Sequence, residues 1–226
     1  MPPTLEIAAV SVEDARQAQT GGADSLELLR DLGRGGLTPQ LELVRAVRDA
    51  VTIPIHVMLR PHDNGFVYTR QEIDAMLAAL ENWKPLGIDG VVFGAQTADG
   101  RVDVALMRAV AAQAAPIPIT LHRALDFSVE PEQTLAALAG IVPRVLTAGP
   151  APTAWEGQAV VRHWVARFGA QFRFVSSGGL TREHLTRFAA EIGAAEAHVG
   201  GAARTHDAVD SLKVRALKAA LNESSR

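Results

Sequence analysis

The order of short β-forming runs and longer helical segments constrains this chain more than any other feature of its sequence. Brief runs rich in apolar and β-branched residues alternate with segments whose apolar residues recur at helical spacing, and this pair of elements repeats eight times. The 226 residues divide into eight repeats of about 28, close to the size of one unit of a (β/α)8 barrel. We therefore predict an α/β fold, a single TIM-barrel domain over residues 1–226, with a frayed tail at residues 222–226.

The positions of the elements follow from these patterns. The strands are expected at residues 5–9, 25–28, 55–59, 90–93, 119–122, 144–146, 172–175 and 197–199. The helices are expected near residues 11–20, 39–50, 69–84, 103–114, 131–139, 154–168, 182–192 and 207–221. Ser11, Thr69 and Thr153 each stand three residues before an acidic residue, a pattern typical of a helix N-cap. A doubly wound open sheet is the alternative fold, but the glycine-rich fingerprint of such sheets does not follow the first strand.

The composition argues against several classes of partner. Acidic and basic residues are interspersed and give a net charge of −3, so the sequence shows no basic footprint for nucleic acid or for an anionic membrane. The absence of cysteine removes disulfides, thiolate metal ligands and thiol nucleophiles. No apolar run approaches the roughly 18 residues of a membrane span, and residues 1–4 do not resemble the start of a secretion signal. We therefore expect a cytoplasmic protein.

Polar residues within the expected strands are the main candidates for chemistry. Five strands carry a carboxylate or an imidazole, and two of them end in an arginine: Glu6, Glu27, His56, His122, His198, Arg60 and Arg123. Such groups are expensive to bury without partners, and the interior of a TIM barrel is normally aliphatic. The long links at residues 29–38, 60–68 and 123–130 follow strands and so belong to the face that carries active sites. Two interpretations of these residues stay open. They act as general acids, general bases and anion-binding groups, or they form a salt-bridged structural layer.

Two glycine pairs indicate an anion site. Gly178 and Gly179 follow the seventh expected strand, and Gly200 and Gly201 follow the eighth. The loops after these strands often bind phosphate through backbone N–H groups in this fold, because glycine lets the anion approach closely. We predict that these glycines bind a phosphorylated or otherwise anionic ligand. The alternative is that they only supply turn geometry.

Three further features have more than one interpretation. Residues 60–66 form either a mobile flap over the barrel mouth or a rigid loop. Asp126 positions Arg123, acts as an acid or caps the next helix. Met58 is a soft metal ligand or fills space in the core.

The sequence also resembles the CutC family, long described as copper homeostasis proteins. The resemblance rests on motifs that occur in order from about residue 5 to about residue 204. These motifs lie at residues 5–7, 21–28, 35–39, 54–61, 89–95, 121–126, 144–147, 177–179 and 198. The resemblance implies a cytosolic TIM barrel, a homodimer or larger homo-oligomer, and a role in copper binding or trafficking.

The chain departs from the family pattern at two positions. Many members have one cysteine in strand 1 and another in strand 2, to which copper(I) binding is attributed, whereas this chain has Ala8 and Leu29. Copper(I) prefers thiolate and thioether ligands, so the two replacements remove the soft site. The matched polar positions are Glu6, Glu27, His56, Arg60, His122, Arg123, Asp126 and His198. Such a set of oxygen, nitrogen and guanidinium groups suits a small anionic ligand.

Three hypotheses follow from this reasoning. The first is copper handling through the strand histidines and Met58, as the resemblance implies. The second is a TIM-barrel enzyme acting on a small phosphorylated or carboxylated metabolite, with Arg60 and Arg123 binding the anion. In that case Glu27 or a histidine of strand 5 or strand 8 transfers protons. The third is a scaffold without catalytic activity.

Overall fold

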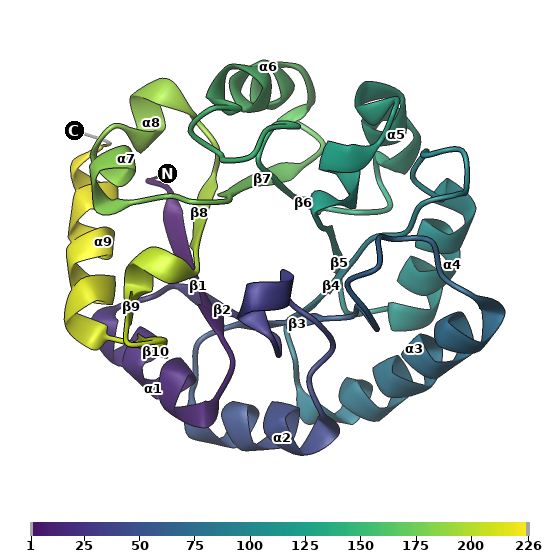
Figure 1. Cartoon of the computed structure of the whole chain (residues 1–226), viewed down its shortest axis with the longest axis horizontal. Coiled ribbons are helices and arrows are strands. Elements are labelled where there is room, and N and C mark those ends of the chain that lie inside the picture. The colour runs from purple at the N-terminus through teal and green to yellow at the C-terminus, as the bar shows by residue number, and fades with distance from the viewer. Residues whose placement is uncertain (1, 225–226) are drawn as a thin grey trace.

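Eight parallel strands form a closed barrel with helices around it (Figure 1). The computed structural model describes residues 2–224, and in it each strand pairs with its sequence neighbours while β8 pairs with β1. The barrel strands are β1 (Thr4–Ala9), β2 (Ser25–Leu28), β3 (Ile55–Met58), β4 (Gly90–Phe93), β5 (Ile119–Leu121), β6 (Arg144–Thr147), β7 (Arg173–Ser177) and β8 (Glu196–Val199). The predicted (β/α)8 barrel is confirmed, and the closure of the sheet rules out the open-sheet alternative.

The helices lie outside the barrel and connect successive strands (Figure 1). They are α1 (Val12–Gly21), α2 (Leu41–Ala50), α3 (Arg70–Trp83), α4 (Val104–Ala114), α5 (Pro131–Leu138), α6 (Gln158–Phe168), α7 (Arg182–Thr186), α8 (Phe188–Glu191) and α9 (Ser211–Glu223). Short 3-10 turns also occur in the links, namely η1 (Leu32–Arg34), η2 (Lys84–Leu86), η3 (Arg123–Phe127) and η4 (Gly201–Ala203). Within residues 2–224, none of the helices combines the length and apolar character needed to cross a bilayer.

Two of the predicted helix starts are confirmed by their capping hydrogen bonds. The Ser11 hydroxyl accepts a hydrogen bond from the Asp14 N–H at 3.0 Å at the start of α1. Thr69 and Glu72 form a reciprocal capping box at the start of α3. Both caps satisfy N–H groups that the first turn of a helix leaves without partners.

The predicted start at Thr153 is wrong. Thr153 and Glu156 do form the reciprocal hydrogen bonds of a capping box, but they enclose an isolated turn, and α6 begins only at Gln158. At Gly157 the chain passes close to the end of β6: a Cβ there would lie 1.8 Å from the carbonyl oxygen of Ala148. This close approach separates the turn from the helix.

The last third of the chain differs from the prediction in three places. The helix predicted at residues 182–192 is broken at Arg187 into α7 and α8. The last helix begins four residues later than expected, because a hairpin of β9 (Arg204–Thr205) and β10 (Ala208–Val209) precedes it. In the turn of this hairpin, the backbone of His206 and Asp207 lies in the left-handed region. The sequence analysis did not predict a turn at these two residues. Helix α9 runs through Glu223, into the tail predicted at residues 222–226; residues 225–226 lie outside the described residues.

Alternation along the strands separates an outer core from the barrel interior. In β1, Leu5, Ile7 and Ala9 belong to the main hydrophobic core between strands and helices. Glu6 and Ala8 take the other face and point into the barrel. Polar groups at the even-numbered positions of β1 are therefore brought together with those of the other strands.

The link between β2 and α2 crosses the C-terminal mouth of the barrel (Figure 1). Arg30 and Leu37 pair through reciprocal backbone hydrogen bonds of 2.9 and 2.8 Å, which close this link into a compact loop. On the neighbouring link, within residues 60–66, Asp63 accepts a hydrogen bond of 2.8 Å from the Nε of Arg34. The two loops over the mouth are thus joined by an ion pair.

Candidate functional site

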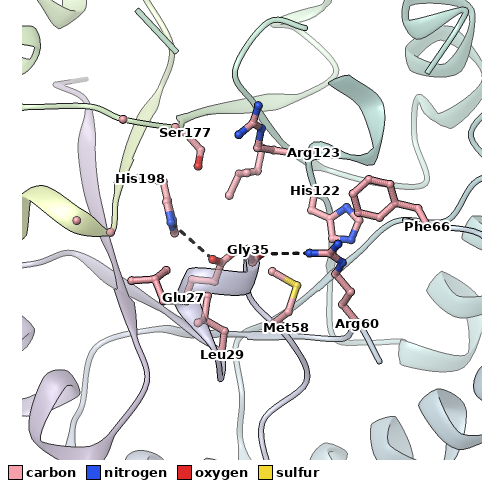
Figure 2. A pocket seen from close by; sticks show the side chains of 16 residues that line it. Glu27, Leu29, Gly35, Met58, Arg60, Phe66, His122, Arg123, Ser177 and His198 are labelled. Atoms are coloured by element: carbon pink, nitrogen blue, oxygen red, sulfur yellow. Dashed lines mark hydrogen bonds and ion pairs between the residues drawn. The ribbon is translucent and has the colours of Figure 1, made fainter. Parts of the chain in front are cut away.

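A cavity of about 300 Å³ lies at the C-terminal mouth of the barrel (Figure 2). Nine of the predicted site residues line it, namely Glu27, Arg60, His122, Arg123, His198, Gly178, Gly179, Gly200 and Gly201. The other lining residues are Leu29, Leu32, Gly35, Met58, Phe66, Leu146 and Ser177. The three predicted site residues that do not line the cavity are Glu6, His56 and Asp126.

Glu6 lies beneath the cavity at the centre of a buried ionic network. Its Oε2 is 2.6 Å from the Nδ1 of His56 and 2.7 Å from a guanidinium nitrogen of Arg144. Its Oε1 is 2.9 Å from the Nδ1 of His198. Burial alone would raise the pKa of Glu6, but Arg144 and the hydrogen bonds from both histidines hold it well below its usual value. Glu6 is therefore an anion that orients two imidazoles from below.

Arg144 and Glu196 belong to the same network, and the sequence analysis missed both. The Nε of Arg144 donates to Glu196 at 2.9 Å, and its Nη1 donates to the hydroxyl of Thr120 at 3.1 Å. The Nε of Arg173, the first residue of β7, donates to the carboxylate of Glu196 at 2.8 Å. Although burial opposes its charge, Glu6 and Glu196 raise the pKa of Arg144. The lower layer is therefore salt-bridged, as one of the two interpretations that the sequence left open expects.

His198 connects this lower layer to the cavity. Its Nε2 lies 3.6 Å from the Oε2 of Glu27, while the Oε1 of Glu27 has no hydrogen-bond partner among residues 2–224. Burial raises the pKa of Glu27, despite the opposing charge of His198. Burial also acts to lower the pKa of His198, but Glu27 and Glu6 outweigh it and raise this pKa. The two groups form a coupled pair that can hold or release one proton.

His122 is a neutral hydrogen-bond donor. Its side chain is buried, and its Nδ1 accepts the N–H of Ala124 at 3.2 Å, so the ring proton is on Nε2. That Nε2 has no partner within the described residues. Burial, with a further contribution from the positive charge of Arg60, lowers the pKa of His122 to about 3. His122 therefore stays uncharged across the physiological pH range.

Two glycines of the β4 segment make room for imidazole rings. A Cβ on Gly94 would lie 2.6 Å from the Cε1 of His122, and a Cβ on Gly90 would lie 2.3 Å from the Cδ2 of His56. Both distances are too short for real contacts. The rings of β3 and β5 can therefore lie across β4 only because these positions carry no side chain.

Arg60 is buried at the end of β3, on the same side of the cavity as His122 (Figure 2). Its Nη1 lies 3.4 Å from the carbonyl oxygen of Gly35 in the loop over the mouth. Its guanidinium carbon lies 4.8 Å from the centre of the Phe66 ring. The Nε of Arg60 has no partner in the described part of the chain. The guanidinium is thus only weakly satisfied by protein groups.

Arg123 is held in place by Asp126. Its Nε donates to Asp126 at 2.8 Å and its Nη2 donates to the carbonyl oxygen of Ala151 at 3.0 Å. Asp126 also accepts hydrogen bonds from the hydroxyl of Thr147 and from the N–H of Ala148. Asp126 is therefore fully engaged and positions Arg123, whose Nη1 donates no hydrogen bond to any group of residues 2–224.

Two aromatic rings connect the arginines. The rings of Phe66 and Phe127 lie 5.8 Å apart, and the guanidinium carbon of Arg123 lies 5.9 Å from the centre of the Phe127 ring. Phe66 in turn contacts Arg60 and the ring of His122, the two ring centres being 5.0 Å apart. The sequence analysis did not single out either phenylalanine.

The glycine loop after β7 lies beside Arg123, and the glycine loop after β8 lines another part of the same cavity. Gly178 and Gly179 have φ angles of +114° and +67°, which side chains rarely allow. Within residues 2–224, no carbonyl or side chain accepts a hydrogen bond from the N–H groups of Gly178, Gly179 or Gly200. A Cβ on Gly178 would lie 3.4 Å from the Nη1 of Arg123. The free donors of loop and guanidinium are therefore adjacent.

The side chains offer a poor site for copper(I). Donor atoms of Glu6, Glu27 and His198 lie within 4.8 Å of one another. Glu6 is, however, already paired with Arg144, whose positive charge opposes a cation there. Met58 supplies the one sulfur atom in the cavity wall, and Ala8, Leu29 and Met58 form a small apolar cluster. This donor set does not match the preference of copper(I) for thiolates.

Fold and site together define a TIM-barrel protein with a cavity lined by ionisable side chains at its C-terminal mouth. A sequence profile of the CutC family matches residues 4–203, and the chain belongs to this family. The human protein named copper homeostasis protein cutC homolog is 37% identical over 195 residues, which cover 86% of this chain and 71% of the human protein. A CutC family protein of Chromobacterium violaceum is 39% identical over 195 residues, 86% of this chain and 79% of that protein.

Solved structures show the same fold. A crystal structure of CutC from Streptococcus agalactiae superposes with a TM-score of 0.82 at 22% identity and covers 88% of this chain and 98% of its own. Phosphoribosyl anthranilate isomerase from Thermotoga maritima superposes with a TM-score of 0.66 at 14% identity over 99% of this chain and 100% of that chain. At such identities the likeness concerns the fold alone.

Proposed function

We propose that the mouth cavity binds a small organic anion and carries out proton transfer on it. The observation that supports this most directly is the presence of two guanidiniums, those of Arg60 and Arg123, in the same cavity as the Glu27 carboxylate with its unpaired oxygen. The cavity of about 300 Å³ is at the small end of ligand pockets and suits a metabolite of modest size. The ligand class is a phosphorylated or carboxylated metabolite.

The anion-binding part of the proposal rests on groups with free donors. Arg123 is fixed through two of its nitrogens and keeps the third free. Charge-assisted hydrogen bonds from such a preorganised guanidinium are stronger than those between neutral groups. The N–H group of Gly178 adds a neutral donor beside it, and those of Gly179 and Gly200 add donors elsewhere in the same cavity wall. This combination favours an anion with several oxygens.

The proton-transfer part of the proposal rests on Glu27 and His198. A general acid or base works best when its pKa lies near the working pH, and burial moves the pKa of Glu27 upward in that direction. Glu6 holds His198 from below, which fixes its Nε2 toward Glu27. The pair can therefore take up and return a proton without moving.

Copper handling is the second candidate, because relatives are named copper homeostasis proteins. In this chain it would depend on Met58 and the strand histidines, since Ala8 and Leu29 carry no thiolate. We propose accordingly that copper(I) binds more weakly than the organic anion. The cytoplasmic location and the homodimeric or larger assembly implied by the family are part of the proposal, and cell fractionation and light scattering test them.

One set of measurements on the full-length protein separates these functions. Mass spectrometry of the native protein identifies co-purified anions, and calorimetry with inorganic phosphate measures the affinity of the pocket. We expect Arg123→Ala to weaken phosphate binding at least about 10-fold and Arg70→Ala, on the exposed face of α3, to have no effect. Copper(I) binding tighter than micromolar that is lost in His198→Ala would favour copper handling. Binding of neither ligand would leave the scaffold hypothesis.

A further inference from the structure

The two sides of the cavity differ in the groups that they present: one side can accept a proton, and the other offers hydrogen-bond donors. Figure 2 shows Glu27 and His198 on one side and Arg60 and His122 on the other. The first pair can accept a proton, and the second pair can only donate hydrogen bonds. A ligand between them meets a base at one atom and a hydrogen-bonding, positively charged wall at another.

The donor side is suited to a carbonyl oxygen. The Nδ1 of His122 is occupied by the N–H of Ala124 in the first turn of η3, which leaves the buried, unpartnered Nε2–H as the remaining donor of a ring that lines the cavity. A neutral imidazole fixed in this way polarises a carbonyl without giving up its proton. Arg60 lies beside it and adds a full positive charge where negative charge would develop on oxygen.

The acceptor side is suited to the carbon next to that carbonyl. Glu27 is buried, and its Oε1 has no partner among residues 2–224. A carboxylate in such a position is a stronger base than one in water, because burial disfavours its charge. Its other oxygen faces the Nε2 of His198 at 3.6 Å, so the proton that it accepts can be shared within the pair.

A third part of the cavity wall, around Arg123, would bind the anionic end of such a ligand. Arg123 lies apart from Arg60 in the cavity wall (Figure 2), and Gly178 lies beside Arg123. The two arginines therefore define separate subsites, and a terminal phosphate at Arg123 would leave the carbonyl end for Arg60 and His122. Binding energy from the remote phosphate can then be used at the reacting carbons.

We infer that this cavity enolises a small phosphorylated α-hydroxycarbonyl compound, with Glu27 as the base and His122 and Arg60 as the groups that stabilise the enolate oxygen. The Glu27 carboxylate removes a proton from the carbon adjacent to the carbonyl, and the electron pair of that C–H bond forms the carbon–carbon double bond. The carbonyl π electrons move to oxygen, which accepts hydrogen bonds from His122 and Arg60. Return of the proton to the same carbon re-forms the carbonyl and regenerates the Glu27 carboxylate. No other reactant is consumed. The inference rests on the proposed anion pocket and assigns its reaction.

Hydrogen exchange in heavy water tests this inference directly. The full-length protein is incubated in D2O with glycolaldehyde phosphate, dihydroxyacetone phosphate or glyceraldehyde 3-phosphate, and loss of the α-carbon proton is followed by NMR. We expect exchange above the uncatalysed rate with at least one of the three. Glu27→Gln is expected to slow it about 100-fold or more, and His122→Ala by about 100-fold. His122→Gln, whose amide can donate from a similar place, is expected to retain more activity than His122→Ala.

Controls make each outcome decisive. Circular dichroism confirms that the variants are folded, and Arg70→Ala serves as the matched surface control. Phosphate binding that persists in Glu27→Gln shows that the Arg123 subsite is intact. Exchange with none of the three probes by a protein that binds phosphate overturns the inference and leaves the proposed anion pocket standing. Failure to bind either phosphate or the probes overturns the proposed function itself.

Discussion

The Glu6 carboxylate of β1 lies 2.7 Å from the guanidinium of Arg144 in β6, although these two strands do not pair with each other. The contact crosses the barrel interior, and both side chains are almost completely buried. Glu6 also fixes His56 and His198. The Glu6–Arg144 ion pair therefore links the stability of the barrel to the orientation of the His198 imidazole, which faces Glu27.

Removing the charge of Glu6 should destabilise the barrel strongly. Breaking one partner of a buried ion pair leaves the other uncompensated and typically costs about 3–5 kcal/mol. We expect Glu6→Gln to lower the free energy of unfolding by about this amount, measured by urea denaturation at neutral pH. Glu42→Gln, on the exposed face of α2, is the control and should change little. A Glu6→Gln variant as stable as the wild type would contradict this role.

Acid should weaken the fold through the same residue. The folded protein holds the pKa of Glu6 well below the ordinary value of 4.5. The corresponding stability is therefore fully present above that ordinary pKa and is lost as the pH falls through the lower, folded pKa. We expect the unfolding free energy of the wild type to decline below about pH 4.5. In Glu6→Gln this part of the decline should be absent, and a superimposable pH profile would argue against it.

His122 should remain neutral well below the usual histidine pKa. Because its pKa is lowered to about 3, the unfolded chain takes up a proton between pH 6.5 and 3 that the folded protein does not. The neutral His122 therefore lowers the free energy of unfolding by about 1.4 kcal/mol for each pH unit that the pH falls from 6.5 towards 3. Nitrogen-15 NMR should show an unchanged, Nε2-protonated ring from pH 8 to pH 5. A midpoint near 6.5 would refute the neutral-donor assignment.

Asp126 should act on ligands only through Arg123. We expect Asp126→Asn to weaken phosphate binding by about 10-fold, because it releases the guanidinium from its fixed position. Calorimetry on Asp126→Asn, Arg123→Ala and the double variant gives the coupling between the two changes. The double variant should bind no more weakly than Arg123→Ala alone. Additive losses would show that Asp126 contacts the ligand independently.

Restoring thiolates should create a copper(I) site. Ala8 and Leu29 belong to one small cluster with Met58, so cysteines at both positions would bring two thiolates near a thioether. We expect the double variant Ala8→Cys/Leu29→Cys to compete with a chromophoric copper(I) chelator, and the wild type to compete far less. The serine pair Ala8→Ser/Leu29→Ser controls for polarity. Equal copper(I) affinity in all three proteins would show that copper binds elsewhere.

The fold could be predicted from the sequence because its signals are local. Alternating strands and helices, and caps such as Ser11 and Thr69, depend on residues only a few positions apart. The break at Arg187 and the hairpin at His206 and Asp207 could not, because tertiary packing and left-handed backbone decide them. The isolated turn at Thr153 shows that a correct capping motif need not start a helix.

The candidate site was only partly predictable. The strand positions of Glu27, Arg60 and His198 indicated that they would meet at the mouth, and they do line one cavity. The division into a structural lower layer and a cavity depends on the stagger of strands around the barrel, which brings Arg144 against Glu6. No local pattern encodes that stagger. The contribution of Phe66 depends likewise on how a loop folds back over the barrel.

Because Gly90 and Gly94 carry no side chains, the β4 segment leaves room for the imidazole rings of His56 and His122. An alanine at either position would push an imidazole of the adjacent strand away from β4. At Gly94 such a change would alter the shape of the cavity wall, which His122 lines, while every ionisable group stayed in the sequence. The shape of the cavity can therefore change through a strand whose own residues do not line it.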